Sequence, residues 1–139
     1  MRYLLVLLLV LVSQQNQAET VTWRGFDIHY TTFTSTLIPA EVAQAHGIVR
    51  SDQRVVTNIV IQKEGRPVAA EVRGTATNLL NQLFNLGFVE VQEQDAIYYL
   101  ASQVIDQRDT LRFTIDITPG AGDETYTLKF TRQYFKGAK

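Results

Sequence analysis

The sequence contains no cysteine at any of its 139 positions. This absence excludes disulfide bonds, a thiol nucleophile, a thiolate metal site and a lipid anchor attached to cysteine. A domain of this chain that folds outside the cytoplasm must therefore be stabilised by its hydrophobic core alone, without covalent cross-links.

Histidine is almost as scarce, with His29 and His46 as the only two. They lie far apart and belong to no short ligand motif such as HxH or HExxH, so their spacing does not indicate a transition-metal site. The acidic residues in the predicted turns around Asp106 and Asp123 lack the carboxylate density of a calcium loop. We therefore expect neither a metal nor any other cofactor.

An excess of charge of one sign is also lacking. The chain has 13 Lys and Arg residues against 14 Asp and Glu residues, a formal net charge of −1. The charges are mixed along the sequence, and no basic stripe of the kind that binds nucleic acid is present. We expect no nucleic-acid partner.

Only one long apolar run exists, from Tyr3 to Val12. It is too short to span a bilayer, which takes roughly 20 apolar residues. Arg2 precedes it, and a polar stretch that ends at Ala18 follows, which is the layout of a secretory signal peptide. The sequence predicts a signal peptide over 1–18 and a single domain over 19–139 without a transmembrane segment. The predicted location is the periplasm, and release to the outside remains an open alternative.

Alternation of apolar and polar residues dominates the rest of the chain and predicts half-buried β-strands. Gly87 stands where this alternation changes parity and is interpreted as a bulge. The predicted fold is all-β: an immunoglobulin-like antiparallel sandwich of about seven strands with one short helix, or alternatively a small β-barrel. The predicted strands cover 26–30, 55–61, 68–72, 84–91, 96–105, 111–117 and 126–134.

The segment EVAQAHGIVRSDQR, residues 41–54, holds the densest mixture of reactive side chains. Pro39 suits the start of a helix, and Gly47 suits its left-handed stop, so the segment predicts a short helix followed by a strand from about Gln53. A plain connector does not need the polar residues that follow. We predict that they form an interaction surface, consisting of His46, Arg50, Ser51, Asp52 and Arg54.

The sequence offers little support for catalysis. The nucleophile motif GxSxG is absent. Ser51 and Asp52 are adjacent, so on a strand they point to opposite faces and cannot easily serve one imidazole. We predict no catalytic residues and no enzymatic activity, and keep a hydrolase using His46 and Ser51 as an alternative.

Several runs of this sequence resemble a small exported family of Gram-negative bacteria, the domain of unknown function 4426. The matching segments are FDIHYTTFTSTLIPAEVAQAHGIVRS, NIVI, PVAAEVRGTATNLL and FVEVQEQDAIYYLA, and the resemblance covers roughly Val21 to Phe135. It implies a periplasmic β-sandwich and supplies no activity, cofactor or catalytic residue.

The function predicted from the sequence is that of a non-catalytic periplasmic domain that binds a protein or an envelope component. Strand addition at an exposed sheet edge would be a natural mechanism. A carrier of a small ligand in an internal cavity is the second alternative.

Overall fold

A computed structural model describes residues 18–105, 108–120 and 122–135. The predicted signal peptide lies outside these residues except for Ala18, so its cleavage stays a prediction. Within the described part of the chain, no helix is long and apolar enough to cross a bilayer.

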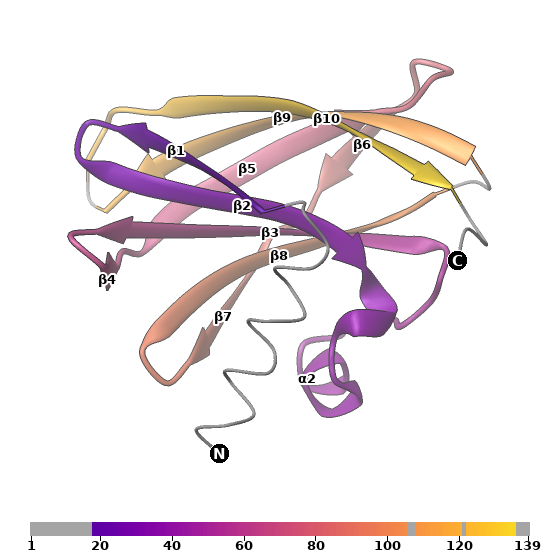
Figure 1. The fold of residues 1–139 in the computed structure, drawn as a ribbon, viewed down its shortest axis with the longest axis horizontal. Helices are drawn as coiled ribbons and strands as arrows, with labels where there is room; N and C mark the ends of the chain where they lie inside the picture. The colour runs from indigo at the N-terminus through magenta and orange to yellow at the C-terminus, as the bar shows by residue number, and fades with distance from the viewer. Residues whose placement is uncertain (1–17, 106–107, 121, 136–139) are drawn as a thin grey trace.

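The chain folds into two antiparallel β-sheets packed face to face (Figure 1). The first sheet has the order β1-β2-β3-β8-β7, with the short β4 paired to β3, and the second has the order β10-β9-β5-β6. The prediction of an all-β sandwich is therefore confirmed, and the sheets do not close into a barrel. The strands are β1 (Glu19–Trp23), β2 (Phe26–Thr34), β3 (Arg54–Lys63), β4 (Arg66–Pro67), β5 (Ala70–Thr77), β6 (Leu83–Leu86), β7 (Val89–Glu93), β8 (Ala96–Val104), β9 (Arg108–Pro119) and β10 (Tyr126–Phe135).

The structure has ten strands where the sequence predicted about seven. Two of the additional strands, β1 and β4, were not predicted. The third arises because the strand predicted over 84–91 is two strands, β6 in one sheet and β7 in the other. Gly87 lies between them, so it is not a bulge: the alternation changes parity because the chain crosses from one sheet to the other.

The main core lies between the two sheets. Ile59 and Ile61 of β3 pack there with Phe113, Ile115 and other inward-facing residues of the second sheet, and all four are at most 1% exposed. Full burial of one such side chain contributes about 1.5–3 kcal/mol. The core is large enough to stabilise a domain without disulfides.

A second, smaller core lies on the outer face of the first sheet. Here the 3-10 helix η1 (Ser35–Leu37) and the helix α2 (Ala40–Ala45) connect β2 to β3. Ile38 and Ala43 of this connection pack against Val56, Val91 and Leu100 of the sheet. This second layer explains why Val55 and Val56, which point to opposite faces of β3, are both buried.

Along one side of the sandwich, which we call the seam, the edge strand β1 of the first sheet contacts the edge strand β10 of the second. Arg132 of β10 donates a hydrogen bond to the carboxylate of Glu19 on β1, with 2.6 Å between Nη2 and Oε1. Tyr30 of β2 donates to the other carboxylate oxygen at 2.8 Å. The Arg132 guanidinium also lies over the rings of Tyr30 and Phe130, where cation–π attraction is favourable. The edges β1 and β10 are thus tied together.

Candidate functional site

The two ends of the sandwich differ in the side chains that they display. At one end, tight polar turns connect the strands, at Arg24–Gly25, Glu64–Gly65 and Gln94–Asp95. At the other end lie the β5–β6 connection (78–82), at the upper right of Figure 1, and the β2–β3 connection (35–53), which Figure 1 shows lower down, beneath the first sheet. The strand register agrees with this, because it places Arg54 beside Val104 and Thr77 beside both Leu83 and Arg112.

Of the large hydrophobic side chains that are exposed in the described residues, nearly all lie at the second end. Among the described residues, seven large hydrophobic side chains are exposed, and only Val89 lies elsewhere. The other six occupy the two connections or the strand ends that border them: Leu37, Val49, Leu79, Leu80, Leu83 and Val104. We call this region the leucine end.

The most prominent part of the leucine end is the β5–β6 hairpin. Leu79, Leu80 and Leu83 are 60%, 76% and 63% exposed. Leucine is an unusual residue for a hairpin loop, where polar and turn-forming residues dominate. Water contact with these side chains costs free energy that a partner surface would recover.

Asn78 fixes the shape of this hairpin. Its side-chain oxygen accepts hydrogen bonds from the backbone N–H groups of Leu80 at 3.0 Å and Gln82 at 2.9 Å. Its side-chain nitrogen donates to the Gln82 side chain at 2.7 Å. Asn81 completes the turn in a left-handed conformation, φ 61°, that asparagine tolerates better than most residues. The loop therefore holds its leucines in one arrangement, which lowers the entropy cost of binding.

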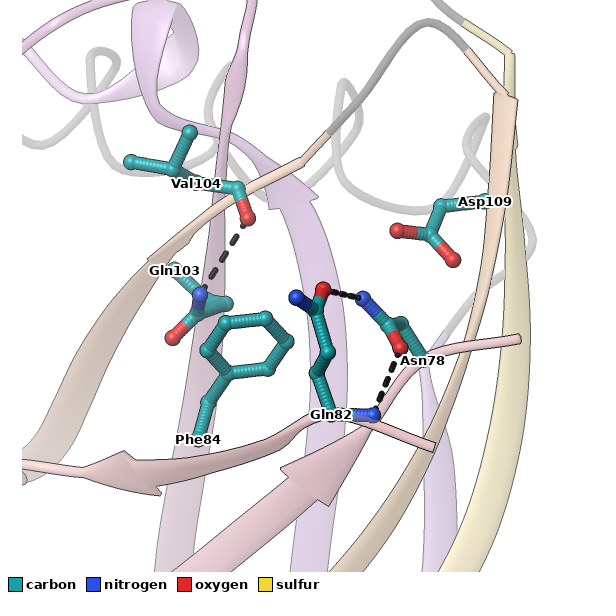
Figure 2. A pocket seen from close by; sticks show the side chains of 6 residues that line it. All are labelled: Asn78, Gln82, Phe84, Gln103, Val104 and Asp109. Atoms are coloured by element: carbon teal, nitrogen blue, oxygen red, sulfur yellow. Dashed lines mark hydrogen bonds between the residues drawn. The ribbon is translucent and has the colours of Figure 1, made fainter. Parts of the chain in front are cut away.

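A small pocket opens beside the hairpin, between the ends of the two sheets (Figure 2). Its volume is about 210 Å³. Three carboxamides, one carboxylate, one aromatic ring and one aliphatic side chain line it, contributed by Asn78, Gln82, Phe84, Gln103, Val104 and Asp109.

The polar segment predicted from the sequence belongs to the same end. Arg50 donates a hydrogen bond to the carbonyl oxygen of Thr36 at 2.9 Å. Ser51 and Ser35 are joined twice: the Ser51 N–H donates to the Ser35 hydroxyl, which donates to the Ser51 carbonyl oxygen. Part of the polarity of this segment is thus explained by the fold, since these bonds hold the β2–β3 connection together.

The remaining predicted residues lie around this framework. His46 follows the last residue of α2, and Gly47 takes the left-handed conformation predicted for the helix stop, φ 68°. Asp52 is exposed, and Arg54 begins β3 beside Val104. The structure places all five predicted residues near the leucine end, and their role in an interaction stays a prediction.

His46 and Ser51, the pair of the hydrolase alternative, do not meet in a hydrogen bond among the described residues. Among the described residues, the Ser51 hydroxyl has the Gln53 N–H as its hydrogen-bond partner, at 3.0 Å, rather than the His46 ring. His29, the other histidine, has both ring nitrogens engaged, with Thr20 at 2.8 Å and Gln62 at 3.1 Å. No group of three His, Cys, Asp or Glu side chains that could hold a metal occurs among the residues that the structure describes.

The exposed leucines and the pocket were not identified from the sequence. One signal was present: the apolar residues of NLLNQL interrupt a segment that is otherwise typical of a loop. Asn78 and Asp109 carried no signal of their own, because their roles depend on hydrogen bonds to the hairpin backbone.

The chain belongs to the DUF4426 family, a domain of unknown function whose family model matches residues 20–137. No curated protein sequence matches it. A crystal structure of a DUF4426 family protein from Pseudomonas aeruginosa PAO1 is 36% identical, with a TM-score of 0.82, and the match covers 88% of this chain and 98% of that one.

More distant structures share the fold alone. A copper-bound variant of FetP from uropathogenic Escherichia coli strain F11 is 12% identical, with a TM-score of 0.64 over 85% of this chain and 95% of that one. FetP as isolated after expression in the periplasm of E. coli BL21(DE3) is 14% identical, with a TM-score of 0.60 over 86% and 94% of the two chains.

Proposed function

We propose that this member of the DUF4426 family is a non-catalytic periplasmic domain that binds a protein or another envelope component through its leucine end. The observation that carries the proposal is the one-sided distribution of exposed apolar side chains, six of seven at one end of the described structure. If this end of the molecule had no partner, there would be no physical reason for exposed apolar side chains to concentrate there.

The geometry of the leucine end supports a binding role. Leu79 and Leu80 project from a hairpin that Asn78 holds by hydrogen bonds to both sides of the turn. A rigid apolar anchor surrounded by polar groups is the usual form of a binding hot spot. Arg50 and Asp52 of the β2–β3 connection and Arg54 at the start of β3 would provide charges that orient a partner at this end.

The alternatives have weaker support. The described pocket, at about 210 Å³, is smaller than the roughly 300–1,000 Å³ typical of small-ligand sites. A hydrolase would need the Ser51 hydroxyl to donate to the His46 ring, and no hydrogen bond between these two side chains occurs among the described residues. Copper binding, which the FetP variant displays, is not proposed for this chain, because its described residues do not bring suitable ligands together.

Site-specific photo-cross-linking in the native periplasm tests the proposal. A photoreactive amino acid at position 80 is expected to form a discrete adduct with the partner, whereas the same group at Arg66, exposed at the opposite end, is not. The partner identified in this way is then purified and its affinity measured.

Substitutions distinguish a specific surface from general stickiness. The double substitution Leu79→Ser with Leu80→Ser is expected to weaken binding at least about tenfold, since hot-spot side chains contribute 2 kcal/mol or more. Val89→Ser, which removes an exposed apolar side chain from β7, is the matched control and should leave affinity unchanged. Equal effects of the two variants, or adducts from position 66 alone, would overturn the proposal. The pair Arg50→Glu with Arg54→Glu shows whether the polar segment takes part.

A further inference from the structure

One acidic side chain lines the pocket at the leucine end. Asp109 on β9 is only 8% exposed, and none of the ion pairs between described side chains involves it. Its Oδ1 accepts the backbone N–H of Thr110 at 2.9 Å and that of Leu79 at 3.4 Å. Among the described residues no hydrogen bond to Oδ2 is found, and Figure 2 shows the carboxylate at one side of the pocket.

The other lining groups suit a hydrogen-bond donor with a positive charge. The carboxamide oxygens of Gln82 and Gln103 can accept hydrogen bonds, and Phe84 offers the face of a ring. A guanidinium or ammonium group satisfies carboxylate and amide oxygens and is attracted to an aromatic face. A largely buried carboxylate is attracted more strongly to such a partner than an exposed one is, because the effective dielectric constant around it is lower.

We propose that this pocket receives the cationic side chain, lysine or arginine, of an extended protein segment that docks on the leucine end. The inference rests on the proposed function and names the partner's chemistry. The acidic Asp109 favours a cationic side chain in the pocket. The leucines beside the pocket favour apolar residues next to that cation in the partner's segment. Phe84 belongs to β6, an edge strand that pairs only with β5 among the described strands, so a polypeptide backbone could pair alongside it.

Two short peptides test the charge requirement directly. Acetyl-Leu-Arg-Leu-amide is titrated into the isotope-labelled protein, with acetyl-Leu-citrulline-Leu-amide as a neutral peptide of nearly the same shape. The arginine peptide is expected to shift the NMR signals of the side-chain amides of Asn78, Gln82 and Gln103. It should bind at least about tenfold more tightly than the citrulline peptide.

Two substitutions in the pocket should change this preference in opposite directions. Asp109→Asn preserves an oxygen for the Leu79 N–H and removes the charge, so the two peptides should bind equally. Gln103→Glu adds a second carboxylate and should strengthen binding of the arginine peptide several-fold without touching the hairpin. If Asp109→Asn fails to fold, Gln103→Glu alone decides the question.

Equal binding of the two peptides to the unchanged protein would overturn the inference. So would leucine-dependent binding to phosphatidylethanolamine vesicles without any preference for the arginine peptide, because the cation would then come from a lipid headgroup. These outcomes are separable from the proposed function: partner binding lost in the Leu79→Ser, Leu80→Ser variant would still support that function. Retained partner binding in that variant would contradict it whatever the peptides do.

Discussion

Glu19 and Arg132 form an ion pair across 113 positions of sequence, and their pairing joins the first strand of the fold to the last. The Arg132 side chain is 12% exposed and the Glu19 side chain 52%, so the pair is half sheltered from water. Its geometry places one acidic side chain in contact with both sheets, since Tyr30 donates to the same carboxylate.

Glu19→Ala should reduce the free energy of unfolding by about 1–2 kcal/mol, because Arg132 and Tyr30 both lose a charged hydrogen-bond partner. Urea denaturation of the chain measures this change. Glu124→Ala is the matched control: Glu124 pairs with Arg24, but both side chains are more than half exposed, and such pairs contribute at most about 1 kcal/mol. An equal loss in the two variants would show that the seam does not contribute to stability.

Asn78→Ala should destabilise the domain by about 2–3 kcal/mol, because it leaves the N–H groups of Leu80 and Gln82 without an acceptor at the base of the hairpin. Hydrogen exchange should be faster at those two amides than in the unchanged protein. Gln82→Ala removes only the side-chain partner and should have a smaller effect. Unchanged exchange at Leu80 and Gln82 in Asn78→Ala would contradict the assigned role of Asn78.

Gly74→Ala should cost about 1–3 kcal/mol of stability. A Cβ atom at this position of β5 would lie 2.9 Å from Cγ1 of Ile115 and 3.1 Å from the carbonyl oxygen of Thr114. Gly87→Ala is the control, since a Cβ there meets nothing within 4 Å. Thermal unfolding distinguishes the two, and a lower melting temperature for Gly87→Ala than for Gly74→Ala would contradict the packing described here.

Alkaline pH should unfold the domain through its tyrosines. Burial, reinforced by the Glu19 carboxylate, raises the pKa of Tyr30 from 10.0 to about 12. Burial also raises the pKa of Tyr99 to about 12, with Glu90 contributing, and burial does the same for Tyr134. Because the unfolded chain releases these protons more readily, the stability they represent is complete below pH 10 and is lost as pH rises from about 10 to about 12.

A titration that follows phenolate absorbance and circular dichroism together checks this expectation. The ionisation of part of the tyrosines should coincide with loss of the β signal. Tyr99→Phe should weaken the dependence of stability on pH within that window. Ionisation of all tyrosines near pH 10 in a still folded domain would contradict it.

The strands in the middle of the sheets were predictable because each buries one face in the core, so apolar and polar residues alternate regularly along it. Ile59 and Ile61 on β3, and Leu111 and Phe113 on β9, follow it closely. The edge strands β1 and β4 were missed because most residues of β1 and both residues of β4 are exposed, so the alternation is weak in β1 and too short in β4. The crossing between sheets at Gly87 changes the parity of the apolar alternation, and this change was visible in the sequence. A bulge changes the parity in the same way, so the sequence did not show which of the two is present.

The candidate site was predictable only in its polar half. The segment from His46 to Arg54 stands out by composition, whereas Leu79 and Leu80 resemble core residues until the fold places them in a loop. Their exposure depends on Asn78 and on the position of β9 behind the hairpin. The bond from Leu79 to Asp109 joins residues 30 positions apart, and such a relationship leaves no local pattern.

The contact between β1 and β10 also means that the core is complete only when residues 113 positions apart have come together. β10 is an outer strand of its sheet and pairs with β9 alone among the described strands. Until it pairs with β9, Phe113 lacks the stacked ring of Phe130, 4.7 Å away between centroids. The core between the sheets is therefore open along one side until β10, a strand of ten residues, pairs with β9.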